Sequence, residues 1–174
     1  AQVRAVRRVT LVHKANVLPL TCGLFRDSCR EVLEAAGFGA QLDERLVDVA
    51  ALQLVQSPEA FDLIVTSNLF GDILSDLACH WSGGLGLAPS LNWGSGLALA
   101  EPVHGSAPDI VGSGRANPLA AILSAALLLR YQWHENALAT RIEDAVQGFL
   151  ADEGHCDFAT ETTRVVAQGV LERL

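Results

Sequence analysis

The sequence is poor in lysine and contains no methionine. Lys14 is the single lysine among twelve basic residues, and the others are arginine. Arginine stays protonated in proteins, whereas burial and neighbouring charges can tune a lysine to take and release protons. Lys14 is therefore a candidate acid or base, with chance retention as the alternative. The absence of methionine, with Ala1 as the first residue, is compatible with an excised initiator or with a segment of a longer chain.

Other absences disfavour several classes of protein. Acidic residues outnumber basic ones by twenty to twelve, and the basic residues are scattered, so nucleic-acid binding is not expected. The cysteines lack C-x-x-C spacing and no charged leader precedes an apolar segment, which favours a reduced, cytoplasmic setting. The longest apolar stretch, residues 118–129, is shorter than the roughly 20 residues that cross a bilayer, so we expect no membrane partner.

The chain alternates between strand and helix patterns. Short β-branched or apolar runs predict strands at residues 8–12, 61–66 and 97–100. Apolar periodicity and helix-terminating residues predict helices at residues 19–36, 49–56, 69–80, 118–131, 135–150 and 161–174. This alternation predicts an α/β architecture. The glycine-rich stretch 82–86 is interpreted as the boundary between two lobes.

Three aspartates are candidate metal ligands. Asp72 and Asp76 stand four residues apart on the predicted helix 69–80, so their carboxylates share one face. Magnesium and manganese prefer such oxygen ligands, although an aspartate in a first helical turn is also stabilised by the helix dipole without any metal. Gly71 costs helix stability and hints at close approach by a ligand. Asp48, flanked by apolar residues, must be paired, hydrogen-bonded or bound to a cation.

A polar loop is predicted at residues 101–110, which read Glu-Pro-Val-His-Gly-Ser-Ala-Pro-Asp-Ile. Its prolines, glycine, histidine and acids suit a rigid loop with exposed polar groups. The loop is neither a G-x-G-x-x-G turn nor a P-loop, so Rossmann-type and kinase-type sites have no support. An ordinary turn is the alternative, and an isolated His104 is more often a hydrogen-bonding loop residue than a catalyst.

Three motifs in a fixed order point to one family. They are His13-Lys14-Ala15-Asn16-Val17-Leu18-Pro19-Leu20-Thr21, then Gly71-Asp72-Ile73-Leu74-Ser75-Asp76-Leu77-Ala78, then residues 101–110 followed by Ala116-Asn117-Pro118. From about Val9 onward the chain resembles the β-decarboxylating dehydrogenases, which include isocitrate, isopropylmalate and homoisocitrate dehydrogenases. The resemblance implies the two-lobed α/β fold of isopropylmalate dehydrogenase, here partial, with the N-terminal half absent. Residues 1–82 would belong to the smaller, dimer-forming lobe and residues 83–174 to the larger, NAD-binding lobe.

The same resemblance implies roles for the lysine and the aspartates. Lys14 matches the family's catalytic lysine, which helps to remove the substrate hydroxyl proton through water and reaches the active site of the partner subunit. Asp48 matches an aspartate of the catalytic metal site that also crosses the dimer interface, while Asp72 and Asp76 match the pair from the same subunit. A bound Mg²⁺ or Mn²⁺ would polarise the hydroxyl oxygen and stabilise the enolate formed as carbon dioxide leaves. A homodimer is therefore expected.

A dinucleotide site is implied by the resemblance as well. Its residues would be Asn16, Glu101, His104, Gly105, Ser106, Ala107, Asp109, Ile110 and Asn117. An aspartate at position 109 would accept hydrogen bonds from the adenosine ribose hydroxyls and repel a 2′-phosphate. Family members that use NADP tend to carry lysine and tyrosine at the positions of Asp109 and Ile110. NAD is therefore the expected cofactor.

The chain also departs from the family. Members are much longer, and the half absent here supplies the arginines that grip the substrate carboxylates and the tyrosine that protonates the enol. For the intact enzyme we expect oxidative decarboxylation of a small 2-hydroxy di- or tricarboxylic acid. The motifs are closer to those of homoisocitrate and NAD-type isocitrate enzymes. The alternative is a truncated or regulatory-subunit-like member that is inactive by itself, although the retained lysine and aspartates argue against a regulatory subunit.

Overall fold

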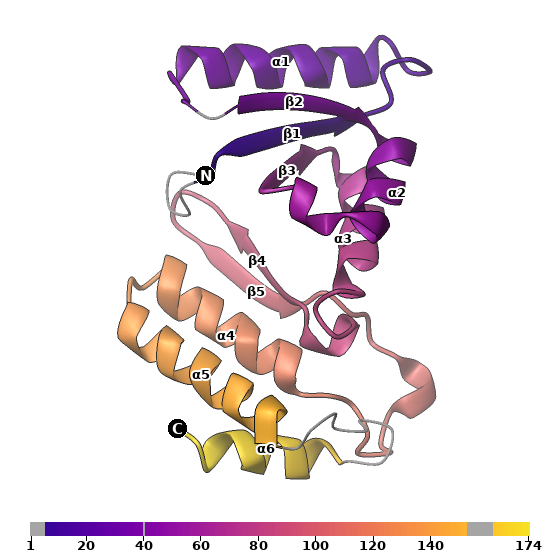
Figure 1. Ribbon diagram of the computed structural model, residues 1–174. Helices are drawn as coiled ribbons and strands as arrows, with labels where there is room; N and C mark the ends of the chain where they lie inside the picture. The colour runs from indigo at the N-terminus through magenta and orange to yellow at the C-terminus, as the bar shows by residue number, and fades with distance from the viewer. Residues whose placement is uncertain (1–5, 40, 153–161) are drawn as a thin grey trace. The chain divides into compact units, whose positions relative to one another are not determined.

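The chain forms two compact units of mixed α/β structure. The computed structural model describes residues 6–39, 41–152 and 162–174, and the first unit ends at Ala78 while the second begins at Cys79 (Figure 1). The predicted α/β class is confirmed. The glycine-rich stretch 82–86 lies inside the second unit. Within the described ranges, none of the helices has the length and hydropathy of a bilayer-spanning segment.

The first unit is built on a sheet of three parallel strands. These strands are β1 (Arg8–His13), β2 (Gln41–Leu46) and β3 (Leu63–Thr66), in the order β2-β1-β3. The central strand β1 is buried along most of its length, as its apolar, β-branched sequence predicts. In the register of the sheet His13 pairs with Leu46 and Val12 with Thr66. All three strands therefore end at the same edge, where open α/β sheets bind ligands.

Helices cover both faces of this sheet (Figure 1). They are α1 (Thr21–Ala35), α2 (Val47–Gln56), the short 3-10 helix η2 (Pro58–Ala60) and α3 (Asn68–Cys79). Val12 of β1 packs with Ala50 of α2 and Leu74 of α3 in the core of this unit. On α1, Leu24 and Val32 keep 69% and 67% of their surface exposed, so much of its apolar stripe is unpartnered in the described chain.

The second unit packs three helices beside an antiparallel hairpin. Its elements are η3 (Leu85–Leu87), β4 (Pro89–Trp93), β5 (Ala98–Pro102), η4 (Pro108–Ile110), α4 (Leu119–Tyr131), α5 (Asn136–Asp152) and α6 (Thr163–Leu171). Helix α4 lies against the hairpin, α5 packs on α4 and α6 on α5 (Figure 1). Leu119, Phe149 and Val166 are among the buried residues of this core. The hairpin and α4 frame the predicted loop 101–110.

In the part of the chain that the structure describes, the observed helices and strands match most of the predicted ones, with two additional strands and three short 3-10 helices. Strand β2, Gln-Leu-Asp-Glu-Arg-Leu, was not predicted because it is an edge strand rich in charged residues. Strand β4 was not predicted because Pro89 and Asn92 weaken its strand pattern. Helix α6 begins at Thr163, while position 161, the predicted start of this helix, lies outside the described residues.

Candidate active site

The carboxyl edge of the first sheet brings two predicted site residues together. Lys14 directly follows β1, and Asp48 is the second residue of α2, which directly follows β2. Because these strands are neighbours in parallel register, the two side chains emerge side by side. The Lys14 ammonium donates a hydrogen bond to Asp48 Oδ1 over 2.6 Å. The prediction that Asp48 is paired, hydrogen-bonded or bound to a cation is confirmed by this pair.

Asp48 is held in its charged form. The hydrogen bond from Lys14 lowers the pKa of the Asp48 carboxyl below its usual value, and its own and the Val49 backbone N–H groups act in the same direction. Such N–H groups have no partner within the helix at its first turn, and the helix dipole favours a negative charge there. The Asp48 side chain is 62% exposed, whereas that of Lys14 is 24% exposed. The carboxylate therefore has solvent-facing oxygen to offer a ligand.

A tight turn follows Lys14. The Lys14 carbonyl accepts hydrogen bonds from the backbone N–H groups of Val17, at 3.0 Å, and Leu18, at 2.8 Å. Asn16 is exposed in this turn and belongs to the first unit, unlike the other residues predicted to bind the dinucleotide. Its role in cofactor binding stays a prediction.

Asp72 and Asp76 lie one turn apart on α3, and both are exposed. Asp72 Oδ2 accepts a hydrogen bond from Asn68 Nδ2 over 3.2 Å. A Cβ at Gly71 would lie 3.5 Å from the Thr66 methyl group, an ordinary contact, so packing within the chain does not demand a glycine. In the described part of one chain, no three histidine, cysteine or acidic residues gather closely enough to bind a metal. The oxygen donors suit Mg²⁺ or Mn²⁺, but a full ligand set needs donors from elsewhere.

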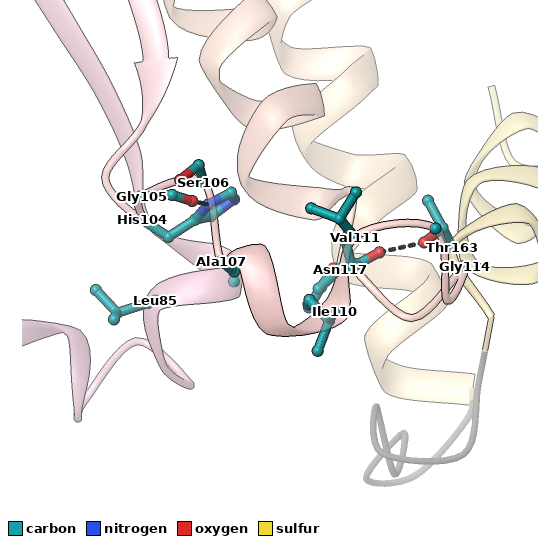
Figure 2. A pocket seen from close by; sticks show the side chains of 13 residues that line it. Leu85, His104, Gly105, Ser106, Ala107, Ile110, Val111, Gly114, Asn117 and Thr163 are labelled. Carbon is teal, nitrogen blue, oxygen red and sulfur yellow. Dashed lines mark hydrogen bonds between the residues drawn. The ribbon is translucent and has the colours of Figure 1, made fainter.

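The second unit contains a cavity of about 830 Å³ beside the predicted loop (Figure 2). Six residues predicted to bind the dinucleotide line it: His104, Gly105, Ser106, Ala107, Ile110 and Asn117. Seven further lining residues were not predicted as site residues: Leu85, Gly86, Val111, Gly112, Gly114, Ala116 and Thr163. The volume falls in the usual range of small-molecule sites, about 300–1,000 Å³, and the lining is largely apolar with a few polar groups, as such sites usually are.

Backbone geometry shapes the wall of this cavity. Ala107 adopts a left-handed conformation with φ of 42°, and Gly112 and Gly114 have φ of 76° and 69°. A left-handed alanine is uncommon and costs energy, which points to a constrained loop. Val103 N–H donates to the Ala88 carbonyl over 3.1 Å and ties the start of the loop to the rest of the unit.

Asn117 joins the cavity to the start of α4. Its Oδ1 accepts a hydrogen bond from Leu119 N–H over 2.9 Å, which satisfies one of the unpaired donors of the helix. A Cβ built on Gly86 would lie only 2.9 Å from Asn117 Nδ2, so Gly86 leaves the space that this side chain fills. Thr163, at the start of α6, donates from its N–H to Gly114 O at 2.7 Å and from its hydroxyl to Ala116 O at 2.5 Å. These contacts attach the cavity wall to the starts of α4 and α6.

Two predicted cofactor residues of this unit do not line the cavity. Glu101 lies on β5 and accepts a hydrogen bond from Asn92 Nδ2 over 3.4 Å. Asp109 is exposed in η4, between the lining residues Ala107 and Ile110. Leu85 and Gly86 fall in the stretch interpreted as a lobe boundary, and Thr163 is far away in sequence. No local motif indicates any of these three as a site residue.

The family is established by comparison with known proteins. The isocitrate/isopropylmalate dehydrogenase family matches residues 1–174, and the chain belongs to it. The isocitrate/homoisocitrate dehydrogenase of Thermus thermophilus is 56% identical over 146 residues, which cover 84% of this chain and 43% of the relative. The homoisocitrate dehydrogenase of Methanocaldococcus jannaschii is 54% identical over 125 residues, covering 72% of this chain and 35% of the relative. The predicted family is thus confirmed, and the chain spans less than half the length of these relatives.

A solved structure supports the fold. The crystal structure of isocitrate dehydrogenase from Methylococcus capsulatus matches with a TM-score of 0.89 and 45% identity, over 96% of this chain and 50% of that one. The predicted fold class, a partial isopropylmalate-dehydrogenase-like fold, is confirmed.

Proposed function

We propose that this chain supplies the general base, the metal-binding aspartates and the dinucleotide loop of an NAD-dependent β-decarboxylating dehydrogenase. The substrate is a small 2-hydroxy acid of the isocitrate, homoisocitrate or 3-isopropylmalate type. The observation that carries the proposal is the pairing of the single lysine, Lys14, with Asp48 at the carboxyl edge of the sheet. Residues 1–82 would serve as part of the dimer-forming lobe and residues 83–174 as part of the NAD-binding lobe.

Lys14, in its neutral amine form, takes the proton of the substrate hydroxyl through a water molecule. A bound NAD⁺ would supply the acceptor for the hydride of the same carbon, and the carbonyl so formed would accept the electron pair released when the neighbouring carboxylate leaves as carbon dioxide. Asp48 holds the lysine side chain through the 2.6 Å contact between Lys14 Nζ and Asp48 Oδ1, while the exposed part of the carboxylate remains available to bind a cation. A positioned acid–base group of this kind contributes about 10²- to 10⁴-fold to the rate.

Asp48, Asp72 and Asp76 would hold the divalent cation. Electrostatic stabilisation of the developing enolate charge is the chemistry that Mg²⁺ or Mn²⁺ supplies when bound. The exposed carboxylates of Asp72 and Asp76, one turn apart, fit such an ion. Since the described residues of one chain gather no three metal-binding side chains, we assign Asp48 to the metal of a second copy, which makes a homodimer part of the proposal.

The cavity beside residues 103–117 would bind the dinucleotide. Its largely apolar lining suits the adenine ring. Asp109 would accept hydrogen bonds from the ribose hydroxyls, which favours NAD over NADP. Asn16 and Glu101 complete the proposed cofactor residues.

The test is an assay of the completed fold. The chain is fused to the N-terminal half of the Thermus thermophilus isocitrate/homoisocitrate dehydrogenase, and NADH formation is followed with isocitrate, homoisocitrate and 3-isopropylmalate. We expect turnover with at least one acid, loss of turnover on chelation and its return with Mg²⁺ or Mn²⁺. The same fusion carrying Asp76→Asn tests the metal site and should need a far higher concentration of Mg²⁺ or Mn²⁺ than the unsubstituted fusion for half-maximal turnover. A folded, dimeric fusion that oxidises none of the three acids would overturn the proposal.

A further inference from the structure

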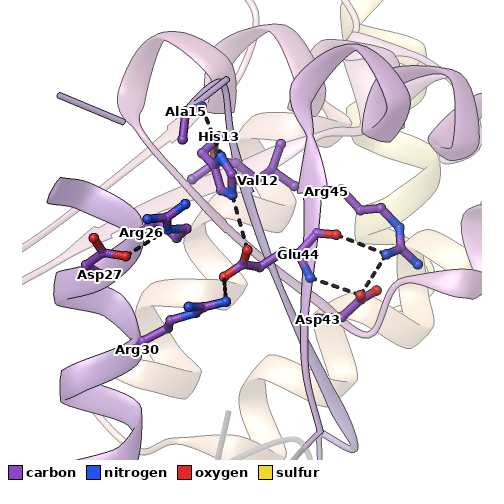
Figure 3. A network of polar contacts seen from close by, with 10 residues as sticks. Val12, His13, Ala15, Arg26, Asp27, Arg30, Asp43, Glu44 and Arg45 are labelled. Atoms are coloured by element: carbon purple, nitrogen blue, oxygen red, sulfur yellow. Dashed lines mark hydrogen bonds and ion pairs between the residues drawn. The ribbon is translucent and has the colours of Figure 1, made fainter. Parts of the chain in front are cut away.

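His13 is a buried, titratable residue to which the proposed chemistry gives no task. It is the last residue of β1, directly before Lys14, and only 6% of its surface is exposed. Its ring lies on the α1 side of the sheet, among polar groups rather than in the apolar core (Figure 3). Burying an imidazole costs energy unless its nitrogens find partners, so the partners indicate what the ring does.

One ring nitrogen is bonded to the backbone on the far side of Lys14. The N–H of Ala15 donates a hydrogen bond to His13 Nδ1 over 3.2 Å. This bond closes a small ring around the Lys14 backbone, as the side chain of an aspartate or asparagine does in an Asx-turn. Since the Lys14 carbonyl also accepts from Val17 and Leu18, the backbone of Lys14 is held on both sides.

The other ring nitrogen faces a carboxylate. Because Ala15 N–H donates to Nδ1, Nδ1 must be unprotonated, and the ring proton sits on Nε2. His13 Nε2 lies 3.7 Å from Glu44 Oε2, which is beyond hydrogen-bond distance, and it makes no hydrogen bond within the described residues; Glu44 Oε1 lies 2.6 Å from the Arg30 guanidinium (Figure 3). Glu44 on β2, paired with Arg30 on α1, thus lies on the Nε2 side of the ring, while Nδ1 points at the turn.

We propose that His13 is a positioning residue for Lys14, because its Nδ1 fixes the turn that aims the lysine ammonium at Asp48. The role rests on the proposed function of Lys14. Without the Ala15 bond, the backbone torsions beside Lys14 are free to change, and the ammonium moves relative to the substrate hydroxyl. A displacement of about 1 Å can lower the rate about 10²-fold. Binding of the hydroxy acid uses other residues and should hardly change, whereas Asn16, a proposed NAD residue, stands in the same turn.

Two variants of similar size separate positioning from packing. His13→Asn places an oxygen where Nδ1 stands, one bond beyond Cγ, and keeps an acceptor for Ala15 N–H. His13→Leu fills the same space without an acceptor. In the fused enzyme we expect His13→Leu to lower kcat about 10- to 100-fold with the KM for the hydroxy acid within about twofold, and His13→Asn to restore most of kcat. If His13 had a purely structural role, His13→Leu and His13→Asn proteins of equal thermal stability would have equal kcat.

A second readout needs no activity. Amide hydrogen exchange in the 174-residue chain should show Ala15 protected in the unsubstituted protein and in His13→Asn, and at least about tenfold faster in His13→Leu. If His13→Leu fails to fold, His13→Gln, which moves the acceptor one bond outward, takes its place in both measurements. Equal kcat in the Asn and Leu (or Gln) variants would overturn the positioning role while the proposed function stands. An inactive unsubstituted fusion would overturn the proposed function and the positioning role with it.

Discussion

Lys14 Nζ and Asp48 Oδ1 lie 2.6 Å apart although the two residues are 34 positions apart in the sequence. The parallel pairing of β1 with β2 creates this contact, since each residue stands just beyond the end of its strand. A lysine paired in this way has a fixed direction, and a proton acceptor that works through water needs such positioning.

Replacement of Lys14 should abolish most of the activity. We expect Lys14→Ala in the fused enzyme to lower kcat by at least about 100-fold, as loss of a general base does. Lys14→Arg should be nearly as poor, because arginine keeps the charge beside Asp48 but does not release its proton. Arg7→Ala, at a side chain that is 90% exposed, is the control for loss of a basic residue and should keep full activity. Normal turnover of Lys14→Arg would show that charge alone is needed.

The pKa of the Asp48 carboxyl should lie below its ordinary value. Its pKa is lowered first by the hydrogen bond from Lys14, so the pair stabilises the fold above the unfolded pKa of about 3.9 and loses this effect as pH falls through the folded pKa. A carboxyl-carbon NMR titration of the chain should give a midpoint below 3.9. In Lys14→Ala the midpoint should rise towards the ordinary value. An unchanged midpoint in that variant would contradict the pairing.

Much of the fold follows from local patterns. The buried strand β1 and helices α3 and α4 could be predicted because apolar periodicity and the residues at their ends agree. Strand β2 could not, since its charged edge sequence shows no apolar alternation. The Lys14–Asp48 contact depends on this strand lying next to β1, so spacing alone could not predict it.

The candidate cofactor site was predictable only in part. Residues 104–107 carry a specific motif, and they do line the cavity. Gly86 lines the cavity because it packs against Asn117, and Thr163 does so because its N–H bonds to Gly114. Contacts between residues so far apart in sequence leave no local sequence signal. Glu101, also predicted for the site, lies on β5, where it contacts Asn92 and does not line the cavity, so its role in cofactor binding stays a prediction.

Cofactor choice should depend on Asp109 and Ile110. The fused enzyme should turn over faster with NAD than with NADP, because the Asp109 carboxylate repels a 2′-phosphate. Asp109→Lys combined with Ile110→Tyr should shift the ratio of kcat/KM values towards NADP by at least about tenfold, or roughly 1.4 kcal/mol. Asp152→Lys, which introduces the same charge change on α5, is the control and should leave the ratio unchanged. Better turnover of the unsubstituted fusion with NADP would contradict the prediction.

Any side chain at position 86 should destabilise the protein, because it would collide with Asn117. A Cβ at position 86 would lie 2.9 Å from Asn117 Nδ2 and 3.0 Å from its Cβ, so Asn117 has to move. Movement weakens the hydrogen bond from Leu119 N–H, and the start of α4 loses its partner at the cavity wall. We expect Gly86→Ala to lower the free energy of unfolding by about 1–3 kcal/mol.

The same variant should bind the dinucleotide more weakly. Because Gly86 and Asn117 both line the cavity, the KM for NAD of the Gly86→Ala fusion should rise more than the KM for the hydroxy acid. Gly96→Ala is the matched control, since a Cβ at Gly96 has no neighbour within 4 Å. It should leave both unfolding and KM within experimental error. Thermal melts and initial rates measure the two effects separately, and a Gly86→Ala protein with unchanged stability and unchanged KM for NAD would show that Asn117 does not hold this wall.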